Sequence, residues 1–440
     1  MCMSTTEQPA FDDRYDLTVF PAAVDAGGHA DPATAAWIQA EAQGFHDPHL
    51  APELVDRLAG HHAVDRKRFT SVLQREPLAG SLGADAPVAT FASFDRTLQV
   101  GGAEPLPAHL ISNVTVRPTH RRRGVLRAMM TESLGWAAAE GYAVAALTVS
   151  EATIYRRFGF GPATTVHSVA VTTDARFRLQ SAPSGRCELI DSRTLLELGP
   201  RLFARFHAVH PGSVDRQSKH WGRIAGTEAE KGGDDPAVRA AAHYDEAGTA
   251  DGYVSYRFGG WDSKPHTLEV LDLVAATPDA YLGLWDFLAS VDLAERVTWE
   301  AAPSDDPLRW ALADWRVVST TSLDDWLWLR VLDPVRAFEA RGYTEGAEGS
   351  LVFSVADPLG FADGVFRMRV AGGRATVERD DAAVAELAVD APTLGSLYLG
   401  GTDARVLAAA GTLRELVPGA AQKAASLLAP VSPVWGISHF

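Results

Sequence analysis

The chain has few cysteines, no excess of basic residues and no long uncharged hydrophobic stretch. Two cysteines in 440 residues, Cys2 and Cys187, cannot build a disulfide framework, and no Cys or His spacing is typical of a zinc site. We therefore expect a reducing compartment and no metal. No apolar stretch approaches the ~18 residues that span a bilayer, and the polar first residues lack a signal-peptide core. These absences favour a cytoplasmic protein.

The excess of charge is acidic, with 56 acidic against 40 basic residues and a formal net charge of −16. This sign argues against general nucleic-acid binding and favours cationic ligands, although solubility alone also accounts for an acidic surface. Walker loops and GxGxxG turns, which bind nucleotides, are missing too. The length predicts about three domains of ~150 residues.

The first part of the chain follows a strand, helix, strand pattern. Asp31 and Pro32 open a helical stretch that Gly44 ends. A later helix has Leu126, Met129, Met130, Leu134 and Ala137 on one face, and strands are expected at 88–91, 111–116 and 143–149. This order predicts a sheet covered by helices.

The second part repeats this rhythm, with strands at 268–274 and 297–300 around a helix at 281–293. Placing Pro278 on Pro118 aligns the two strand, proline, helix units without a gap and suggests an internal repeat. From about residue 329 alternating residues predict a hairpin at 366–377, and Ala-rich helices follow between 402 and 428. We expect an α+β third domain.

The segment with most chemical information is Val-Arg-Pro-Thr-His-Arg-Arg-Arg-Gly-Val-Leu, residues 116–126. It joins a strand to a helix whose first turn is expected to hold Arg121, Arg122, Arg123 and Gly124. Unpaired N–H groups and the positive end of the helix dipole attract phosphate there, and Gly124 lets the backbone approach a diphosphate. A solvated basic helix start without a ligand is the alternative interpretation.

This segment resembles the acyl-CoA-binding motif of the GCN5-related N-acetyltransferases (GNAT). Residues 150–164, Ser-Glu-Ala-Thr-Ile-Tyr-Arg-Arg-Phe-Gly-Phe-Gly-Pro-Ala-Thr, resemble the Eis (enhanced intracellular survival) branch, which also shares Leu126 where the usual motif has Gly or Ala. The resemblance implies an α+β protein of two tandem GNAT-like lobes, 1–178 and 179–328, and a sterol-carrier-protein-like domain, 329–440. Only the first lobe should be active, because Tyr281-Leu282-Gly283 replaces the arginines in the second.

The family transfers acetyl directly from acetyl-CoA to an amine and needs no metal. By resemblance, the backbone at Val114, Thr115 and Val116 would hold the acetyl and pantetheine parts, and Arg121, Arg122, Arg123 and Gly124 the pyrophosphate. Ser150 would lie near the thioester. Tyr155 stands at the family's general-acid position, and its unperturbed pKa of ~10 keeps it protonated at neutral pH. Taken alone, the residue is better explained as a core or rim tyrosine, and the surrounding match favours the acid.

The chain ends in Val-Trp-Gly-Ile-Ser-His-Phe, an apolar and aromatic tail that we expect to pack against the protein. In Eis proteins the terminal carboxylate reaches the first lobe and accepts the amine proton, so the resemblance implies Phe440 as the base. His439 is an alternative base, and it departs from the acidic residue expected there. A tail that only fastens the third domain is the plainer interpretation.

The acceptor region is expected at Trp37, Phe45 and Asp47, where the family has an aromatic wall and an acidic contact for polyamine-like acceptors. Glu41 and Glu53 are close in sequence, and a carboxylate would attract a cationic amine. The alternatives are helix core for Trp37 and a turn cap for Asp47.

These features predict an acetyl-CoA-dependent N-acetyltransferase for cationic amines of broad range, such as aminoglycosides, polyamines and lysine side chains. The alternative is a catalytically weak protein that binds acyl-CoA or a hydrophobic ligand. A nucleic-acid regulator fits the acidic charge poorly. We expect a small-molecule or peptide amine as partner, no nucleic acid and no membrane, and the resemblance implies a homo-oligomer, a hexamer built from trimers.

Overall fold

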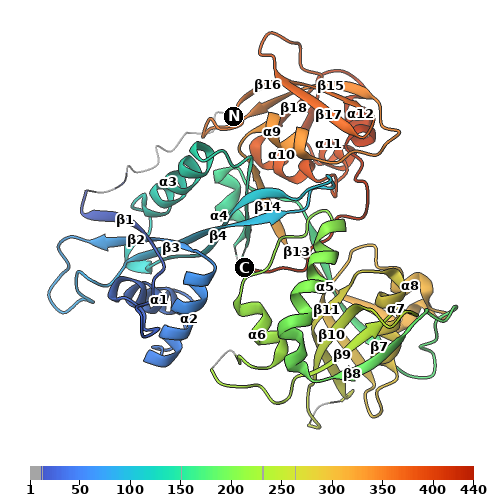
Figure 1. The fold of residues 1–440 in the computed structure, drawn as a ribbon. Coiled ribbons are helices and arrows are strands. Elements are labelled where there is room, and N and C mark those ends of the chain that lie inside the picture. Colours follow the sequence, from blue (N-terminus) through green and yellow to red (C-terminus); the bar gives the residue numbers. More distant parts are fainter. Residues whose placement is uncertain (1–10, 12, 150, 230–231, 263) are drawn as a thin grey trace.

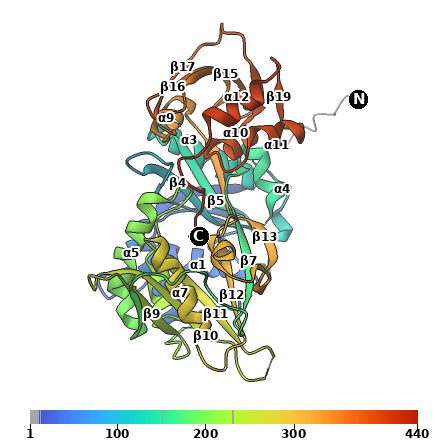
Figure 2. The ribbon, with the colours of Figure 1, turned by 90° about the vertical axis from the view of Figure 1, so that its right-hand side faces the viewer.

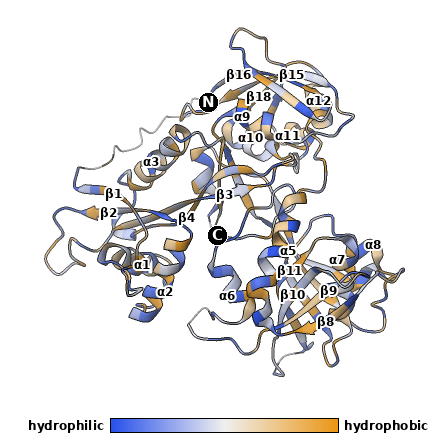
Figure 3. Cartoon of the chain, in the orientation of Figure 1, coloured by the Kyte–Doolittle hydropathy of each residue, from blue (hydrophilic) through white to orange (hydrophobic). Residues whose placement is uncertain are grey.

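In a computed structural model, residues 11, 13–149, 151–229, 232–262 and 264–440 are described, and they form three β-sheets with helices packed on them (Figure 1). Hydrophobic residues are spread over all three parts of the chain (Figure 3). One core lies under the first lobe's long helix, one fills the second lobe, and one joins the first sheet to the third domain. The expected α+β architecture of two lobes and a third domain is confirmed.

The first lobe is built on a sheet with the strand order β1-β2-β3-β4-β5-β14-β6. Only β4 and β5 are parallel neighbours. Helices α1 and α2 cover one face, against Phe69 and Ala92, and α3 covers the other, against Phe91. The strands are β1 Tyr15–Pro21, β2 Arg68–Gln74, β3 Ala89–Leu98, β4 Leu106–Val116, β5 Val144–Thr148, β6 Gly161–Pro162 and β14 Leu327–Val331, and the helices are α1 Pro32–Gly44, α2 Pro52–Val64, α3 Val125–Ala139 and α4 Ala152–Tyr155.

The helix expected after Asp31 forms for the expected reason. The Asp31 carboxylate accepts hydrogen bonds from the backbone N–H groups of Ala33 and Thr34, and Pro32 is the first residue of α1.

The second lobe has the strand order β13-β7-β12-β11-β10-β9-β8, and only β11 and β12 are parallel. Its parallel pair therefore corresponds to β4 and β5 of the first lobe. The strands are β7 Thr165–Thr172, β8 Arg186–Ile190, β9 Arg239–Tyr244, β10 Ala250–Phe258, β11 Thr267–Ala275, β12 Arg296–Ala302 and β13 Val318–Asp325, and the helices are α5 Leu195–Val209, α6 Lys219–Ala225, α7 Pro278–Ala289 and α8 Pro307–Ala311.

The third domain holds the expected hairpin, β16 and β17, in a sheet of order β17-β16-β15-β18-β19. It packs on the first lobe through α10, where Gly395 lies so close to the Leu329 carbonyl that a Cβ would come within 2.1 Å of the oxygen. The elements are α9 Pro334–Ala340, β15 Gly349–Ala356, β16 Gly364–Ala371, β17 Arg374–Arg379, β18 Leu387–Asp390, α10 Ala391–Tyr398, α11 Ala404–Ala409, β19 Leu413–Glu415 and α12 Ala420–Leu427.

Sheet membership crosses the expected linear ranges at both boundaries. Strand β7, within 1–178, pairs with β12 and β13 of the second sheet. Strand β14 straddles residue 329 and pairs with β5 and β6 of the first sheet. Each of these two strands therefore belongs to a sheet outside its own sequence range. This exchange holds the two lobes together. Among the described residues, no helix is long and apolar enough to cross a membrane.

A buried ion pair anchors the second lobe where its loop 210–218 meets the sheet. The Arg216 guanidinium donates to both carboxylate oxygens of Asp272, at 2.7 and 2.8 Å, and Tyr253 donates its hydroxyl to the same group. Burial raises the pKa of Asp272, but Arg216 and His220 together outweigh burial and hold that pKa well below its usual value.

Replacing Asp272 by Asn should strongly destabilise the protein, because it leaves the buried Arg216 charge without a counter-charge. We expect the free energy of unfolding to fall by about 3–5 kcal/mol in denaturant titrations. The exposed pair Arg193–Asp234 supplies the control, since Asp234→Asn should cost less than about 1 kcal/mol. Equal losses for the two variants would contradict this assignment.

Candidate active site

The first lobe opens where its two parallel strands separate. Pairing between β4 and β5 ends at Ile111 and Leu147, yet β4 continues to Val116. A bulge opposite Phe91 bends β4 at this point, and Asn113 there has φ +53°, in the left-handed region. Beyond the bulge, β4 has a strand neighbour only on the β3 side.

The free edge of β4 presents backbone donors toward this opening. The Arg117 N–H donates to the Val88 carbonyl on the β3 side. Because alternate residues of a strand direct their N–H groups to opposite sides, the N–H groups of Val116 and Val114 point away from β3. They are two of the three residues, with Thr115, whose backbone the family resemblance assigned to the acetyl and pantetheine parts of acetyl-CoA.

The arginine segment lies before the helix, and the prediction that it forms the first turn is wrong. Residues 118–120 form a 3-10 turn, and α3 begins at Val125, because Arg122 and Gly124 have φ values of +63° and +74° that no helix accepts. An arginine held in this region stores strain, which is common in ligand-binding loops.

The turn nevertheless leaves donors free. Gly124 has no side chain to cap α3, and the first intrahelical bond joins the Ala128 N–H to the Gly124 carbonyl. The side chains of the neighbouring arginines divide their roles: Arg123 donates to the Tyr15 hydroxyl and Arg121 to the Val116 carbonyl, whereas Arg122 is exposed and has no partner among the described residues. The exposed Arg122 guanidinium and the uncapped N-terminus of α3 are therefore separated by only two residues along the chain.

Tyr155 is the last residue of α4 and packs on the same core as Val114 and Val116. Its ring meets Phe160 edge to face at 6.5 Å. Burial, and then the charge of Glu151, raise the pKa of Tyr155 to about 12, so its hydroxyl keeps its proton throughout the neutral range. Ser150, predicted to lie near the thioester, is outside the described residues.

The C-terminus lies in the middle of the molecule, as the two views show (Figures 1 and 2). The terminal carboxylate of Phe440 accepts a hydrogen bond from the Thr148 hydroxyl at 2.5 Å. Thr148 is the residue of β5 that follows its last pair with β4. The Phe440 ring meets Phe94 of β3 edge to face at 5.7 Å. The chain end thus stands where the two strands separate.

His439, the alternative base, does not share this position. Its ring contacts Trp326, 5.1 Å between centroids, and its pKa is lowered by desolvation and then by the positive charges of Lys219 and Arg223. The imidazole is therefore neutral at pH 7.

The residues expected to bind the acceptor divide into core and surface. Trp37 is 0% exposed: it stacks on Phe69 and donates its indole N–H to the Thr70 carbonyl, so the predicted aromatic wall is core packing instead. Phe45 and Asp47 are exposed just past α1. The end of α1 meets the separated part of β4, since a Cβ on Gly44 would come within 2.5 Å of the Thr115 Cβ.

Beside this surface lies a buried row of hydrogen-bonded polar side chains that the sequence analysis did not identify. Asn113, on the bulge, donates to Glu41 at 2.8 Å and accepts from Lys67 at 3.2 Å. Burial lowers the pKa of Lys67 to about 7, helped by Lys219, and raises the pKa of Glu41. No motif marks Lys67, because only folding carries its side chain inside.

This buried row of side chains reaches the C-terminus through an aromatic ring. The Lys67 ammonium lies 4.9 Å from the centroid of the Phe94 ring, on which Phe440 packs. Protonation of Lys67 therefore changes the charge near the terminal carboxylate.

Comparison with known proteins agrees with this geometry. Family models of the acetyltransferase (GNAT) domain match residues 32–163 and 212–331, and a sterol carrier protein domain matches 334–436. An uncharacterized N-acetyltransferase of Streptomyces avermitilis is 36% identical over 428 residues, covering 94% of this chain and 98% of its own. N-acetyltransferase Eis of Mycobacterium tuberculosis is 40% identical over 330 residues, 73% of this chain and 78% of its own.

Solved structures give the same result. Eis1 from Mycobacterium abscessus superposes with a TM-score of 0.79 at 27% identity, covering 97% of this chain and 100% of that one. The chain belongs to the Eis family of N-acetyltransferases. Its reaction class is therefore acetyl transfer to nitrogen, and acetyl-CoA is the donor that such acetyltransferases use.

The second lobe of this Eis-family chain lacks the arginine turn, but the alignment of Pro278 on Pro118 is wrong. Pro278 is the first residue of α7 itself, whereas Pro118 precedes α3 by a separate turn. The residues before α7 are Val-Ala-Ala-Thr, 274–277, without charge or glycine. Tyr281 is buried and donates to Asp306 at 2.8 Å.

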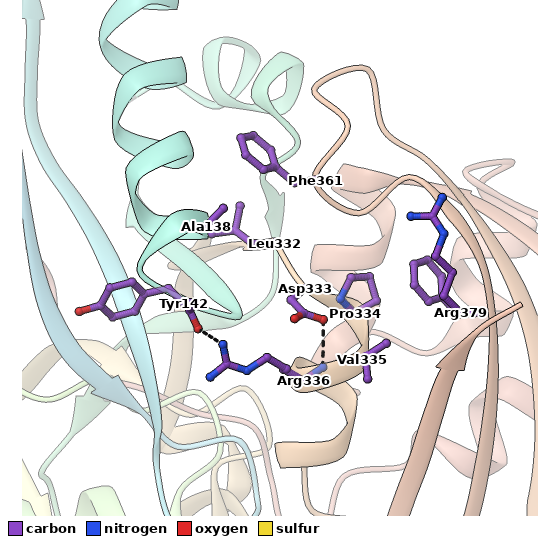
Figure 4. A pocket seen from close by; sticks show the side chains of 11 residues that line it. Ala138, Tyr142, Leu332, Asp333, Pro334, Val335, Arg336, Phe361 and Arg379 are labelled. Atoms are coloured by element: carbon purple, nitrogen blue, oxygen red, sulfur yellow. Dashed lines mark hydrogen bonds between the residues drawn. The ribbon is translucent and has the colours of Figure 1, made fainter. Parts of the chain in front are cut away.

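A separate crevice of about 300 Å³ lies between the first lobe and the third domain of the Eis-family chain (Figure 4). It is lined by Ala138 and Tyr142 near the end of α3 and by Leu332, Phe361 and Phe366. The arginine turn is at the other end of this helix, about 20 Å away at 1.5 Å per residue, so the crevice is no part of the site. Among the described residues, no group of three His, Cys, Asp or Glu side chains is placed to hold a metal.

Reversing the charge of Arg122 should weaken binding of acetyl-CoA to the Eis-family enzyme. We expect Arg122→Glu to raise the KM for acetyl-CoA by about tenfold or more, the loss of one charge-assisted phosphate contact, while kcat changes little. The same change at Arg414, an exposed arginine of the third domain, is the control. An unchanged KM for acetyl-CoA would show that Arg122 does not bind the pyrophosphate.

Proposed function

We propose that this enzyme transfers the acetyl group of acetyl-CoA directly to a primary amine of a cationic small molecule or peptide, with its own terminal carboxylate as general base. The observation that carries the proposal is the place of the Phe440 carboxylate, held by Thr148 at the end of β5 beside the separated strands. A chain end is usually frayed and solvated, so a half-buried, hydrogen-bonded terminus needs a reason of its own.

The donor site fits the residues on both sides of the opening. The backbone N–H groups of Val114 and Val116 would hold the thioester and pantetheine, and the N-terminus of α3 with Arg122 would hold the pyrophosphate. Arg121 and Arg123 support the turn through their contacts with the Val116 carbonyl and the Tyr15 hydroxyl.

The proton balance assigns one role to each of two groups. The amine nitrogen attacks the thioester carbon, a C–N bond forms and the C–S bond breaks. The Phe440 carboxylate takes the proton that nitrogen gives up, and Tyr155 gives its proton to the departing sulfur. Exchange with solvent then returns both groups to their starting states, so no further reactant is needed.

The acceptor is proposed to be cationic because acidic groups border its approach. Asp47 and Phe45 are exposed beside the separated part of β4, and Glu41 lies behind Asn113. A carboxylate here attracts an ammonium group and offsets the loss of its hydration. Lys67 is about half neutral at pH 7, given its pKa of about 7, and opposes an incoming cation less as pH rises. Aminoglycosides, polyamines and lysine side chains all meet this description.

Tyr155→Phe removes the proposed acid and keeps the ring that packs on Phe160. We expect kcat to fall by about 10²- to 10³-fold with little change in the KM for acetyl-CoA, measured by thiol release with spermidine as acceptor. Because the pKa of Tyr155 is about 12, the parent enzyme should not lose activity between pH 8 and 10 through this group. A variant as fast as the parent would show that another group protonates the sulfur.

Ending the chain at His439 removes the proposed base from its position. We expect kcat to fall by about 10²-fold or more. The control is Phe440→Leu, which keeps a terminal carboxylate at the same place and loses only the ring contact with Phe94. That variant should retain most of the activity, and a shortened chain with parental kcat would exclude the carboxylate.

The alternative, a weakly active protein that binds acyl-CoA or a hydrophobic ligand, makes the opposite forecast. It requires the arginine turn but neither Tyr155 nor the terminal carboxylate. Acetyl-CoA binding with turnover that neither variant alters would favour that alternative.

A further inference from the structure

The C-terminal tail is held by the second lobe before it reaches the first. Residues 433–440 form no helix or strand, yet Trp435, Gly436, Ile437 and Ser438 are buried. The Ser438 hydroxyl donates to the Val214 carbonyl at 2.5 Å, and the Ser438 carbonyl accepts from the Trp326 indole at 2.9 Å. The tail is therefore fastened by side chains and backbone of a lobe that has no proposed chemistry.

Trp435 makes the largest of these contacts. Its backbone N–H donates to the Pro211 carbonyl at 2.7 Å. Its ring meets Phe206, His210 and Trp299 edge to face, at 5.1, 5.5 and 5.9 Å between centroids. Its indole N–H donates to the Ala301 carbonyl of β12 at 3.0 Å.

The backbone approaches closely at the next residue. A Cβ on Gly436 would come within 2.4 Å of the Gly212 carbonyl oxygen, so only glycine fits there. The tail is thus seated on the loop between α5 and α6 as a fitted segment.

Trp435 binds where the second lobe repeats the opening of the first. Pairing between the parallel strands β11 and β12 ends at Glu269 and Thr298, although β12 continues to Ala302. Ala301, which accepts from the indole, lies in the part of β12 that no longer pairs with β11. In the first lobe, Thr148 on the second strand of the parallel pair, one residue after its last pair with β4, binds the terminal carboxylate.

We infer that the second lobe is a docking site for the enzyme's own C-terminal tail, and that Trp435 is the positioning residue that places the terminal carboxylate at the first lobe. The inference rests on the proposed role of Phe440 as base. The separated strands of the second lobe then hold a segment of the chain, whereas those of the first lobe bind acetyl-CoA.

The Trp435 anchor is needed because the tail beyond it is long. Five residues beyond Trp435 reach up to about 17 Å when extended, whereas a general base must lie within about 3 Å of the proton that it takes. Hydrogen bonds at Ser438 hold this segment near its end, and the Trp435 indole holds its first residue. Loss of the Trp435 contacts lets the Phe440 carboxylate move away from Thr148 without any change at the acetyl-CoA site.

The kinetic test compares Trp435→Ala with Trp435→Phe. We expect Trp435→Ala to lower kcat by about 100-fold, the size of effect that a misplaced catalytic group produces, with the KM for acetyl-CoA unchanged. Trp435→Phe keeps the ring packing on Phe206 and loses the bond to Ala301, so it should recover much of kcat. Trp310→Ala, which removes a second-lobe tryptophan that is 71% exposed, should behave like the parent.

A double variant tests whether Trp435 acts through Phe440. If it does, Trp435→Ala in a chain ending at His439 should be no slower than the shortened chain alone, because the group that it positions is already gone. Multiplied losses would overturn the positioning role.

A second readout does not depend on activity. Carboxypeptidase digestion followed by mass spectrometry should release Phe440 and His439 from Trp435→Ala at least tenfold faster than from the parent or from Trp310→Ala, with thermal unfolding checked for all three. Equal release would overturn the docking site. Should the chain ending at His439 keep the parental kcat, the proposed base fails, while faster release from Trp435→Ala would still support docking. If Trp435→Ala does not fold, Trp435→Phe carries both tests, with intermediate release expected and parental release contradicting the inference.

Discussion

The separation of the parallel strands β4 and β5 is the constraint on which the rest of the site depends. Two paired parallel strands have no room for a ligand, because their N–H and C=O groups bond to each other. Once the bulge at Asn113 turns β4 away, the N–H groups of Val114 and Val116 no longer face β5, and the end of β5 keeps only β14 as a strand neighbour. We propose that a pantetheine-like amide chain completes the hydrogen bonds of β4, while the terminal carboxylate accepts one from Thr148.

The same constraint explains why the chain end has to travel so far. The C-terminus lies at the centre of the molecule, between the two lobes and the third domain (Figure 2), and Thr148 binds it there. The tail starts in the third domain, crosses the second lobe at Trp435 and ends in the first. One short segment therefore touches all three parts, and we propose that the second lobe, which lacks the arginine turn, is kept for holding it.

Charges in the site follow burial more than composition. The net charge of −16 describes the surface, where Asp47 is exposed. Inside, the pKa of Lys67 falls to about 7 and that of Glu41 rises, so both groups move toward their neutral forms at the same pH. Asn113 lies between Lys67 and Glu41 and bonds to both.

Local patterns in the sequence were enough for several features, because the interactions that produce them are short in range. The cap of α1 at Asp31 and the hairpin of β16 and β17 both involve residues close along the chain. The resemblance to the Eis branch supplied the family and the order of its parts. It also pointed to Phe440, which no local pattern could place beside Thr148, 292 residues away.

What only the tertiary structure decided involves contacts between distant residues. Trp37 stacks on Phe69 inside the first lobe, although an aromatic residue at that place reads equally well as a ligand wall. The exchange of β7 and β14 between sheets, and the burial of Lys67 behind Asn113, depend on how whole strands pair. A sequence records which side chains are apolar or charged. Which of them lose water is settled when distant segments pack together, because burial is a property of the assembled fold.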